Sequence, residues 1–224
     1  EHNVTPDSPY YYLTELAAQC TAKRMYPDYI SAKKMKENYE GNVFSPMGCR
    51  SFLSPWKDEK GNYKFDGRFN MGVVSLNLPQ IGILARGSEE KYFEILDKRL
   101  ELAEKALLLR YNLLKDVVSD VSPIHWQHGA IARLKKGEKI GRFLTGGYAT
   151  ISLGYIGIYE ATRLITGESN TGEKGRVFAM KIMDRLNDAI NLWHDKHNLG
   201  FGLYGTPAES LTNRFSSLDL SLIH

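Results

Sequence analysis

One cysteine stands in a short run of the chain whose residue types could support sulfur chemistry. Cys49 follows Gly48 and precedes an arginine inside the apolar run 43–55, which Pro46 and Pro55 punctuate. The two prolines prevent a continuous helix, and Gly48 allows backbone conformations that other residues avoid. We therefore predict a finger-like loop with a thiol at its tip. Two interpretations stay open from these residues alone: a thiolate favoured by the arginine, or an inert thiol packed as a small apolar side chain.

Two further groups could bind a ligand. Asn70 stands at the start of a predicted strand, and its amide donates and accepts hydrogen bonds without titrating. By itself, Asn70 is better interpreted as an ordinary turn or strand-entry residue. A second group lies between a short predicted strand and a predicted helix, where free backbone N–H groups make an anion site: Gly205, Thr206, Pro207, Ala208, Glu209 and Ser210. Many helices begin in this way, and Glu209 opposes a phosphate unless it turns aside, so this signal alone is weak.

Two histidine pairs suggest a different chemistry. His125 with His128, and His194 with His197, have the i,i+3 spacing at which two imidazoles on one helix can share a metal ion, and Asp195 adds a carboxylate. Neither pair has the His-Glu-x-x-His form, and no cysteines cluster nearby. We therefore expect exposed or core-edge histidines without a metal, and a zinc-dependent hydrolase remains the weakest alternative.

The elements that would position these groups alternate between strands and helices. Buried strands between long helices are typical of an α/β fold with parallel strands. The longest predicted helix has an apolar stripe that suits core packing better than pairing with a second subunit. We predict strands over 71–78, 148–154 and 200–204, a loop over 82–87, and helices over 8–26, 31–39, 88–117, within 123–134, 156–166, 175–198 and from Pro207 onward.

Three blocks of this sequence, taken together, resemble one enzyme family. The run 47–53 and the run 67–79 resemble the finger loop and following strand of the anaerobic (class III) ribonucleoside-triphosphate reductases, which belong to the glycyl-radical enzymes. The run 203–211 resembles the same family's phosphate loop. The blocks occur in the family's order, and weaker similarity extends over residues 8–219.

The resemblance implies a fold and a reaction. The fold would be part of a ten-stranded α/β barrel with an inserted finger loop that carries Cys49. That cysteine would be the thiyl radical that takes the 3′ hydrogen of a ribonucleoside triphosphate, after which the 2′-hydroxyl leaves as water and a deoxyribonucleotide for DNA replication forms. Asn70 would bind the sugar hydroxyls, and residues 205–210 would hold the phosphates.

The expected reductant is formate, and a small redox protein is the alternative that the sequence leaves open. Oxygen-dependent relatives carry a glutamate two residues past the cysteine, where this chain has Ser51, and formate can supply the missing carboxylate. Met47 is expected near the same pocket. Ser51 and Met47 are therefore candidate substrate-binding residues.

The resemblance also implies that residues 1–224 are one segment of the catalytic barrel. In the family, the radical resides on a glycine in a C-terminal loop near a structural zinc, and an upstream region often binds ATP; we recognise none of these in the 224 residues. We therefore expect a segment that binds no cofactor itself and is inactive alone. The complete enzyme would form a homodimer and require a radical-SAM iron–sulfur activating protein. The alternative is a catalytically inactive nucleotide-binding or assembly segment.

Composition limits the kinds of binding partner and the cellular compartment that the sequence supports. The 224 residues carry Lys+Arg 29 against Asp+Glu 26, and a formal net charge of +3 is too small to indicate nucleic acid or an acidic membrane as partner. No stretch approaches a membrane span, and the first residues lack a basic and then apolar leader pattern. Only 2 cysteines argue against a disulfide framework and for a reducing cytoplasm. We expect Cys20, among small residues of the first helix, to be a buried structural thiol.

Overall fold

The computed structural model describes residues 3–24, 26–27, 29–44, 46–47, 51–53, 57, 60–65, 67–207 and 209–223. The chain divides into two compact units, residues 1–45 and residues 46–224. The assignment of all 224 residues to one segment of a catalytic barrel stays a prediction.

The unit formed by residues 1–45 contains two helices, α1 (Tyr11–Arg24) and α2 (Ala32–Asn38). Ser31 caps α2, because its hydroxyl accepts the backbone N–H of Lys34 at 3.2 Å. No residue of α1 is buried, so Cys20 is exposed, contrary to the expectation of a buried thiol.

The unit formed by residues 46–224 is built on a parallel sheet. Its strands β3 (Phe69–Asn77), β4 (Ala149–Ile156) and β5 (Gly200–Gly205) lie in the order β3-β4-β5, and both neighbouring pairs are parallel. The predicted α/β class with parallel strands is therefore confirmed, and each strand lies within two residues of its predicted bounds. A separate antiparallel pair, the hairpin, consists of β1 (Pro46–Met47) and β2 (Ser51–Phe52).

The helices of this unit follow the strands in the sequence. They are α3 (Leu78–Ala85), α4 (Glu89–Leu114), α5 (Pro123–Trp126), α6 (Ile158–Thr166), α7 (Glu173–His197) and α8 (Ser210–Ile223), with short 3-10 helices at Ser119–Val121 and Gly141–Phe143. None of the helices in the described ranges is long and apolar enough to span a membrane.

The predicted loop over 82–87 is wrong for residues 82–85, which belong to α3. The side chain of Asn77 caps this helix by accepting the N–H of Gln80 at 3.2 Å, and Pro79 occupies the first turn, where its missing N–H is not needed. A Cβ at Gly82 would lie 3.0 Å from Leu164 Cδ1. Glycine is therefore used there for close packing of α3 on α6. The last helix also differs: α8 begins at Ser210 instead of Pro207.

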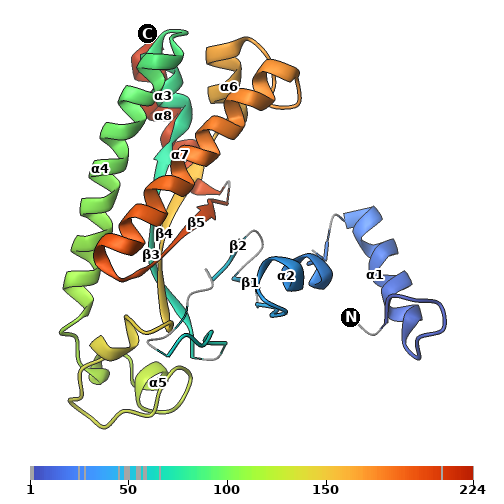
Figure 1. The fold of residues 1–224 in the computed structure, drawn as a ribbon, viewed down its shortest axis with the longest axis vertical. Coiled ribbons are helices and arrows are strands. Elements are labelled where there is room, and N and C mark those ends of the chain that lie inside the picture. The colour runs from blue at the N-terminus through green and yellow to red at the C-terminus, as the bar shows by residue number, and fades with distance from the viewer. Residues whose placement is uncertain are drawn as a thin grey trace. The chain divides into compact units, whose positions relative to one another are not determined.

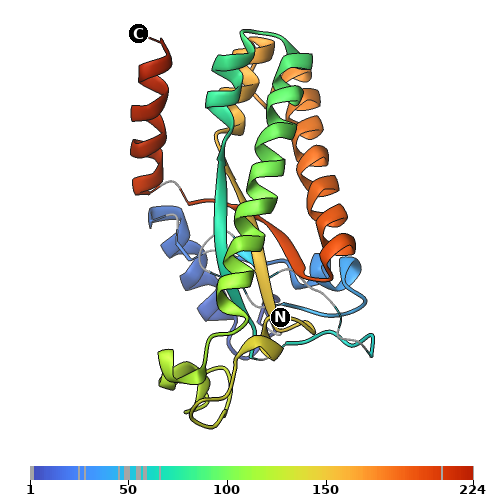
Figure 2. The same cartoon turned by 90° about the vertical axis from the view of Figure 1, so that its left-hand side faces the viewer.

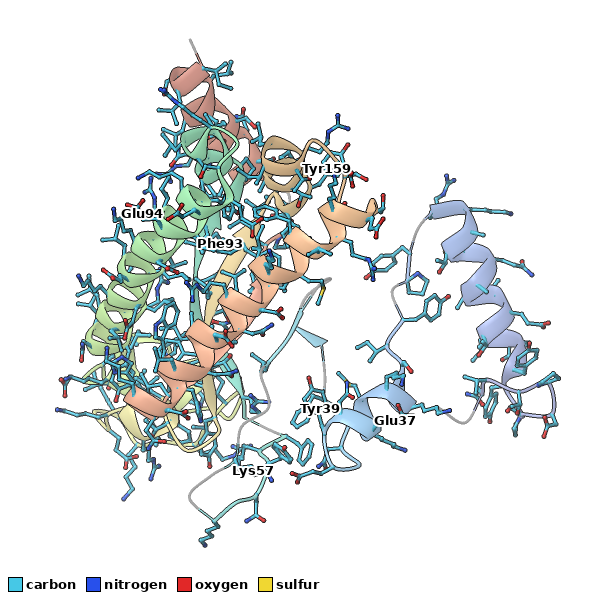
Figure 3. The ribbon with its side chains drawn as sticks, turned by 45° about the horizontal axis from the view of Figure 1, so that its top comes forward. Glu37, Tyr39, Lys57, Phe93, Glu94 and Tyr159 are labelled. Atoms are coloured by element: carbon cyan, nitrogen blue, oxygen red, sulfur yellow. The ribbon has the colours of Figure 1, made fainter. Side chains whose placement is uncertain are left out.

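Helices α4 and α7 cover one face of the sheet (Figure 1, Figure 2). The strand residues Ile151 and Leu153 are fully buried against helix residues that include Leu96 and Ile182. Each such side chain contributes about 1.5–3 kcal/mol by leaving water. Phe93, labelled in Figure 3, belongs to α4. The centre of its ring lies 5.8 Å from that of Phe178 of α7. The apolar stripe of the longest helix thus packs in the core, as predicted.

Charged residues align α4 and α7 along their exposed edges. Three ion pairs join the helices: Glu89 with Lys181 at 2.7 Å, Asp97 with Arg185 at 2.9 Å and Glu104 with Lys196 at 2.9 Å. The partners advance together along both helices, so the two helices run parallel, as crossover helices of a parallel sheet do. The first two pairs are exposed and contribute little stability, whereas the Glu104 side chain is 15% exposed. All three pairs fix the relative register of the helices.

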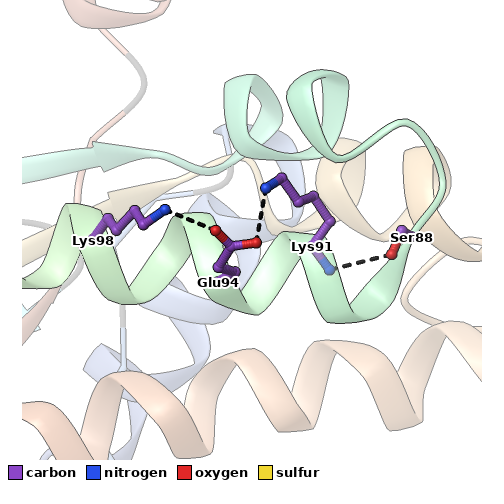
Figure 4. A network of polar contacts seen from close by, with 4 residues as sticks. All are labelled: Ser88, Lys91, Glu94 and Lys98. Carbon is purple, nitrogen blue, oxygen red and sulfur yellow. Dashed lines mark hydrogen bonds and ion pairs between the residues drawn. The ribbon is translucent and has the colours of Figure 1, made fainter.

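The beginning of α4 is capped and followed by a small charge network (Figure 4). Ser88 accepts the backbone N–H of Lys91 at 3.2 Å. Glu94 accepts from the ammonium groups of Lys91 at 2.8 Å and Lys98 at 2.7 Å. Hydrogen bonds from Lys91 and then Lys98, with their positive charges, lower the pKa of Glu94 to about 2. The group is exposed, so this network chiefly organises the helix surface.

Candidate functional site

The face of the sheet turned away from α4 and α7 carries small and polar side chains. Along β4 the side chains alternate, because successive residues of a strand point to opposite faces. Ile151 and Leu153 join the core, whereas Thr150, Ser152 and Gly154 lie on the opposite face. We call this surface the polar face; its members described below are Asn70, Ser75, Thr150, Ser152, Gly154 and Thr206.

Asn70 lies on the polar face and its amide group is held at both ends. Its Nδ2 donates to Ser152 Oγ at 2.5 Å, and its Oδ1 accepts the backbone N–H of Gly72 at 2.6 Å. The register of β3 on β4 shifts between Asn70 and Val73, and Gly72 has a φ of +140° that side chains rarely adopt. This irregularity turns the N–H of Gly72 toward the amide.

Thr206 lies on the same face, directly after β5. Its backbone N–H donates to the carbonyl of Tyr155 at 3.1 Å, and its hydroxyl meets the Ser75 hydroxyl at 2.8 Å. Ser75 belongs to β3, so this contact passes over the central strand at Gly154. A Cβ at Gly154 would lie 2.5 Å from Thr206 Oγ1 and closer still to Ser75 Oγ. Only a residue without a side chain lets these hydroxyls meet.

The structure thus brings Asn70 and Thr206 onto one surface, linked through β4. Sequence reasoning missed Ser75, Ser152 and Gly154 as members of this surface. One signal could have found two of them: residues 150–154 alternate hydroxyl or glycine with isoleucine and leucine. That pattern indicates a strand whose second face is not apolar core.

The rest of the predicted phosphate loop connects β5 to α8, as predicted. Gly205 ends β5, and Glu209 donates its N–H to the carbonyl of Pro207 at 3.0 Å. Glu209 and Ser210 are exposed, and Ala208 lies outside the described residues. The first backbone N–H groups of α8 have no acceptor within the helix, as at every helix start.

The hairpin brackets the predicted reactive cysteine. Met47 pairs with Ser51 in the antiparallel ladder, while Gly48, Cys49 and Arg50 lie outside the described residues. The placement of Cys49 beside Asn70 and Thr206 therefore stays a prediction, as do the roles of Met47 and Ser51.

Arg68 ties the segment after the hairpin to the beginning of the sheet. Its Nε donates to the carbonyl of Gly147 at 3.1 Å, and Nη1 donates to the carbonyl of Leu53 at 3.4 Å. Gly147 precedes β4, and Leu53 directly follows β2. Burial lowers the pKa of the Arg68 guanidinium. This residue thus connects three parts of the chain at the amino ends of β3 and β4.

Helix α8 is anchored by a buried carboxylate at the other end of the strands. Asp219 accepts from Asn77 Nδ2 at 2.9 and 3.1 Å and from Gln80 Nε2 at 3.1 Å. A cavity of about 620 Å³ adjoins it, lined by residues that include Ile156 and Arg163. Neither Asn70 nor Thr206 lines this cavity, so it is separate from the polar face.

The histidines have other hydrogen-bonding partners. A ring nitrogen lies 2.7 Å from a protein oxygen in each of three cases: His125 with Ser122 Oγ, His194 with the Leu199 carbonyl and His197 with Glu104 Oε1. Within the described ranges, no three His, Cys, Asp or Glu side chains gather as a metal would require. The described geometry gives the zinc hydrolase no support.

Comparison with known proteins gives one family. A family model described as anaerobic ribonucleoside-triphosphate reductase matches residues 1–223. The chain is 43% identical over 223 residues to the protein of that name from Enterobacteria phage T4, and 42% identical over 214 residues to that from Salmonella typhimurium strain LT2. These matches cover 97% and 94% of this chain but 35% and 30% of the relatives. The chain therefore spans about a third of their length.

Solved structures show a similar fold. The crystal structure of the anaerobic ribonucleotide reductase from Thermotoga maritima in complex with dATP and CTP has a TM-score of 0.56 and 18% identity, covering 93% of this chain and 37% of that one. The structure of the Thermotoga maritima enzyme with citrate in the active site has a TM-score of 0.54 and 19% identity, covering 76% and 30%. At this identity the similarity concerns the fold alone.

Proposed function

Because the chain belongs to the anaerobic ribonucleoside-triphosphate reductase family, we propose that it forms part of an enzyme that reduces ribonucleoside triphosphates to 2′-deoxyribonucleoside triphosphates. One observation carries the proposal: Asn70 and Thr206, with the hydroxyls of Ser75 and Ser152, share the polar face of a parallel sheet. A sugar and its phosphates need neutral donors and acceptors of this kind, held on a rigid strand framework.

The proposed fold is a ten-stranded α/β barrel in which residues 1–224 form one catalytic segment. In such a barrel the helices lie outside and the polar face lines the interior. The finger loop would then carry Cys49 to the interior. The hairpin suits this arrangement, because its two strands reverse the chain direction around residues 48–50.

The proposed reaction starts at the sulfur of Cys49. As a thiyl radical it takes the hydrogen atom from C3′ of the ribose, and the resulting carbon radical allows the 2′-hydroxyl to leave as water. Formate supplies the two electrons of the reduction and the hydrogen that C2′ gains, and is oxidised to carbon dioxide, while a proton joins the departing hydroxyl to form the water. Cys49 then returns its hydrogen atom to C3′. The complete enzyme stores the radical on a glycine and carries its structural zinc outside these residues.

The remaining residues bind and orient. Asn70 hydrogen-bonds the sugar hydroxyls, and its amide does so without changing charge. Residues 205–210 hold the phosphates with hydroxyl and backbone N–H groups at the start of α8. Met47 and Ser51, adjacent in the hairpin, adjoin the formate.

The second candidate is a nucleotide-binding or assembly segment without chemistry of its own. The share of its relatives that the chain spans, about a third, favours this role for the 224 residues in isolation. The complete enzyme is proposed to act in the cytoplasm, as a homodimer, after activation by a radical-SAM iron–sulfur protein.

The decisive experiment replaces the proposed radical carrier. Cys49→Ala is made in the full length that the gene encodes, and the protein is activated by its radical-SAM partner without oxygen. We expect the glycine radical to form, as seen by electron paramagnetic resonance, while deoxynucleotide production is lost. Cys20→Ala is the matched control, because this exposed thiol lies on α1, and it should leave production unchanged. Production by Cys49→Ala would remove Cys49 from its proposed role.

A further inference from the structure

Ser152 contacts Asn70, the side chain of the polar face that is proposed to bind the sugar hydroxyls. It lies in the middle of β4, between Ile151 and Leu153, and is 4% exposed. Its neighbours Ile151 and Leu153 are core residues, so the hydroxyl of Ser152 is not explained by the packing of α4 and α7. That hydroxyl instead accepts the Nδ2–H of Asn70.

The two hydrogen bonds of Asn70 distinguish the ends of its amide. Gly72 presents an N–H, which only Oδ1 can accept. Ser152 Oγ accepts from Nδ2. If the amide were flipped, Nδ2 would face the N–H of Gly72 and two donors would oppose each other. The N–H of Gly72 holds only the oxygen of the amide. Ser152 holds the nitrogen, and this second contact fixes the plane of the amide.

An amide held in this way keeps unused capacity in a defined arrangement. An asparagine amide has two N–H donors and two carbonyl lone pairs. The bond to Ser152 uses one N–H, and the bond from Gly72 uses one lone pair. One N–H and one carbonyl lone pair therefore remain, in one amide plane and of opposite character. This pair matches two adjacent hydroxyls, one donating to Oδ1 and the other accepting from Nδ2.

The polar face beside Asn70 also contains a hydroxyl that the fold leaves unpaired. Thr150 is in register with Asn70 on β3 and is 1% exposed. Its Oγ1 has no hydrogen-bond partner in the described part of the chain. Leaving a buried hydroxyl unpaired destabilises the folded state. Polar groups that the core does not use thus lie next to Asn70.

We propose that Ser152 is a positioning residue that holds the Asn70 amide in the orientation that recognises the adjacent 2′ and 3′ hydroxyls of a ribose. This inference rests on the proposed function. In this role the Ser152 hydroxyl is used by Asn70 and not by the substrate. Its effect reaches the sugar only through Asn70, so the two residues must be energetically coupled, and the coupling must concern the sugar hydroxyls.

The test measures binding, so it needs neither the radical nor the activating protein. The full-length protein is titrated with a ribonucleoside triphosphate and with its 2′-deoxy counterpart. The recorded ratio is the Kd for the 2′-deoxy nucleotide divided by the Kd for the ribonucleotide, so a high ratio means a preference for the ribonucleotide. We expect Ser152→Ala to lower the preference for the ribonucleotide by about tenfold, the equivalent of one charge-free hydrogen bond. Ser152→Thr keeps the hydroxyl and should restore much of the preference.

A double-mutant cycle separates positioning from a general structural effect. Once Asn70 is alanine, Ser152→Ala should no longer change the ratio, because the amide that it orients is absent. Ser75→Ala is the matched control: it removes a hydroxyl of the same face that contacts Thr206, and its effect should add to that of Asn70→Ala. Thermal unfolding of each variant verifies that it is folded.

The outcomes distinguish the two levels of the proposal. If Asn70→Ala lowers the ratio while Ser152→Ala does not, or if the two effects simply add, Ser152 is not a positioning residue and the proposed function stands. If Asn70→Ala itself leaves the ratio unchanged, the sugar-reading role fails and the inference fails with it. Absence of any nucleotide binding by the unaltered protein overturns the proposed function.

Discussion

Tyr92 combines complete burial with a hydroxyl that has no partner in the described ranges. Its ring packs edge-on against Phe178 at 5.1 Å and Phe93 at 5.6 Å, so the aromatic part is well accommodated between α4 and α7. Tyr92→Phe keeps these contacts and removes an unsatisfied group. We expect it to increase the free energy of unfolding by about 1 kcal/mol in denaturant titrations. Tyr12→Phe, at an exposed position on α1, should have no effect.

The stabilisation by Tyr92→Phe should grow at alkaline pH. Burial raises the pKa of Tyr92, because the phenolate loses its hydration. The folded state therefore retains this proton when the unfolded chain has lost it, and its contribution to stability is complete below pH 10 and declines as the pH rises further. Phenylalanine has no such decline. A loss of stability in Tyr92→Phe at neutral pH would mean that the hydroxyl has a partner after all.

At the scale of the element, β4 determines whether its neighbours can meet. A Cβ at Gly154 would lie 2.5 Å from Thr206 Oγ1 and 2.7 Å from Val73 Cγ1. Gly154→Ala must therefore separate Ser75 from Thr206, and we expect a loss of about 1–3 kcal/mol in unfolding free energy, as for other overpacked sites. Chemical denaturation measures this change.

The next strand offers a matched glycine. At Gly205 the nearest atom to an added Cβ is 3.9 Å away, so Gly205→Ala should change the unfolding free energy little. Adding Ser75→Ala to Gly154→Ala removes one of the clashing oxygens and should recover part of the loss. Equal effects of the alanine at 154 and at 205 would contradict the close approach over β4.

Helices and strands with a regular apolar pattern could be predicted from the sequence. Those that form because they pack on another element could not. Residues 150–154 alternate and α4 repeats its apolar stripe, so β4 and α4 follow from local sequence. Pro79 and Gly82 indicated a break, yet they lie in α3, because Asn77 caps it and Gly82 packs on α6. That packing is tertiary, and a local pattern does not contain it.

The candidate site also has a part that the sequence predicts and a part that depends on neighbouring strands. Asn70 and the loop at Thr206 were found by resemblance to a family. Their contacts with Ser152 and Ser75 depend on strand register, which shifts at the irregularity between Asn70 and Val73. No residue-by-residue pattern fixes which side chain of β4 faces Asn70 once such a shift occurs.

At the scale of the molecule, β3 and β5 each have one strand partner in the described sheet. Strand edges expose unpaired N–H and C=O groups, and a closed barrel removes them by pairing every strand. Under the proposed ten-stranded barrel, both edges would pair with strands of the complete enzyme. The helices α4 and α7 would remain on the outer side.

The two clusters of buried apolar residues in the described part of the chain lie within residues 46–224. The larger core is built around β4, with Leu96 and Ile182 among its fully buried members, and the smaller surrounds Trp126. Within residues 1–45, the buried apolar side chains among those described are Met35 and Phe44. Burial of apolar surface is the dominant favourable contribution to folding. Stability should therefore belong almost entirely to residues 46–224.

A chain restricted to residues 46–224 should consequently unfold in one cooperative transition, at nearly the same denaturant midpoint as the whole chain. Circular dichroism during urea titration measures both. Leu96→Ala leaves a cavity in the larger core and should cost about 2–5 kcal/mol, by the same amount in the short and the whole chain, because every contact of Leu96 in that core is retained. A short chain that fails to fold, or that loses a large part of its stability, would show that residues 1–45 supply packing to the sheet.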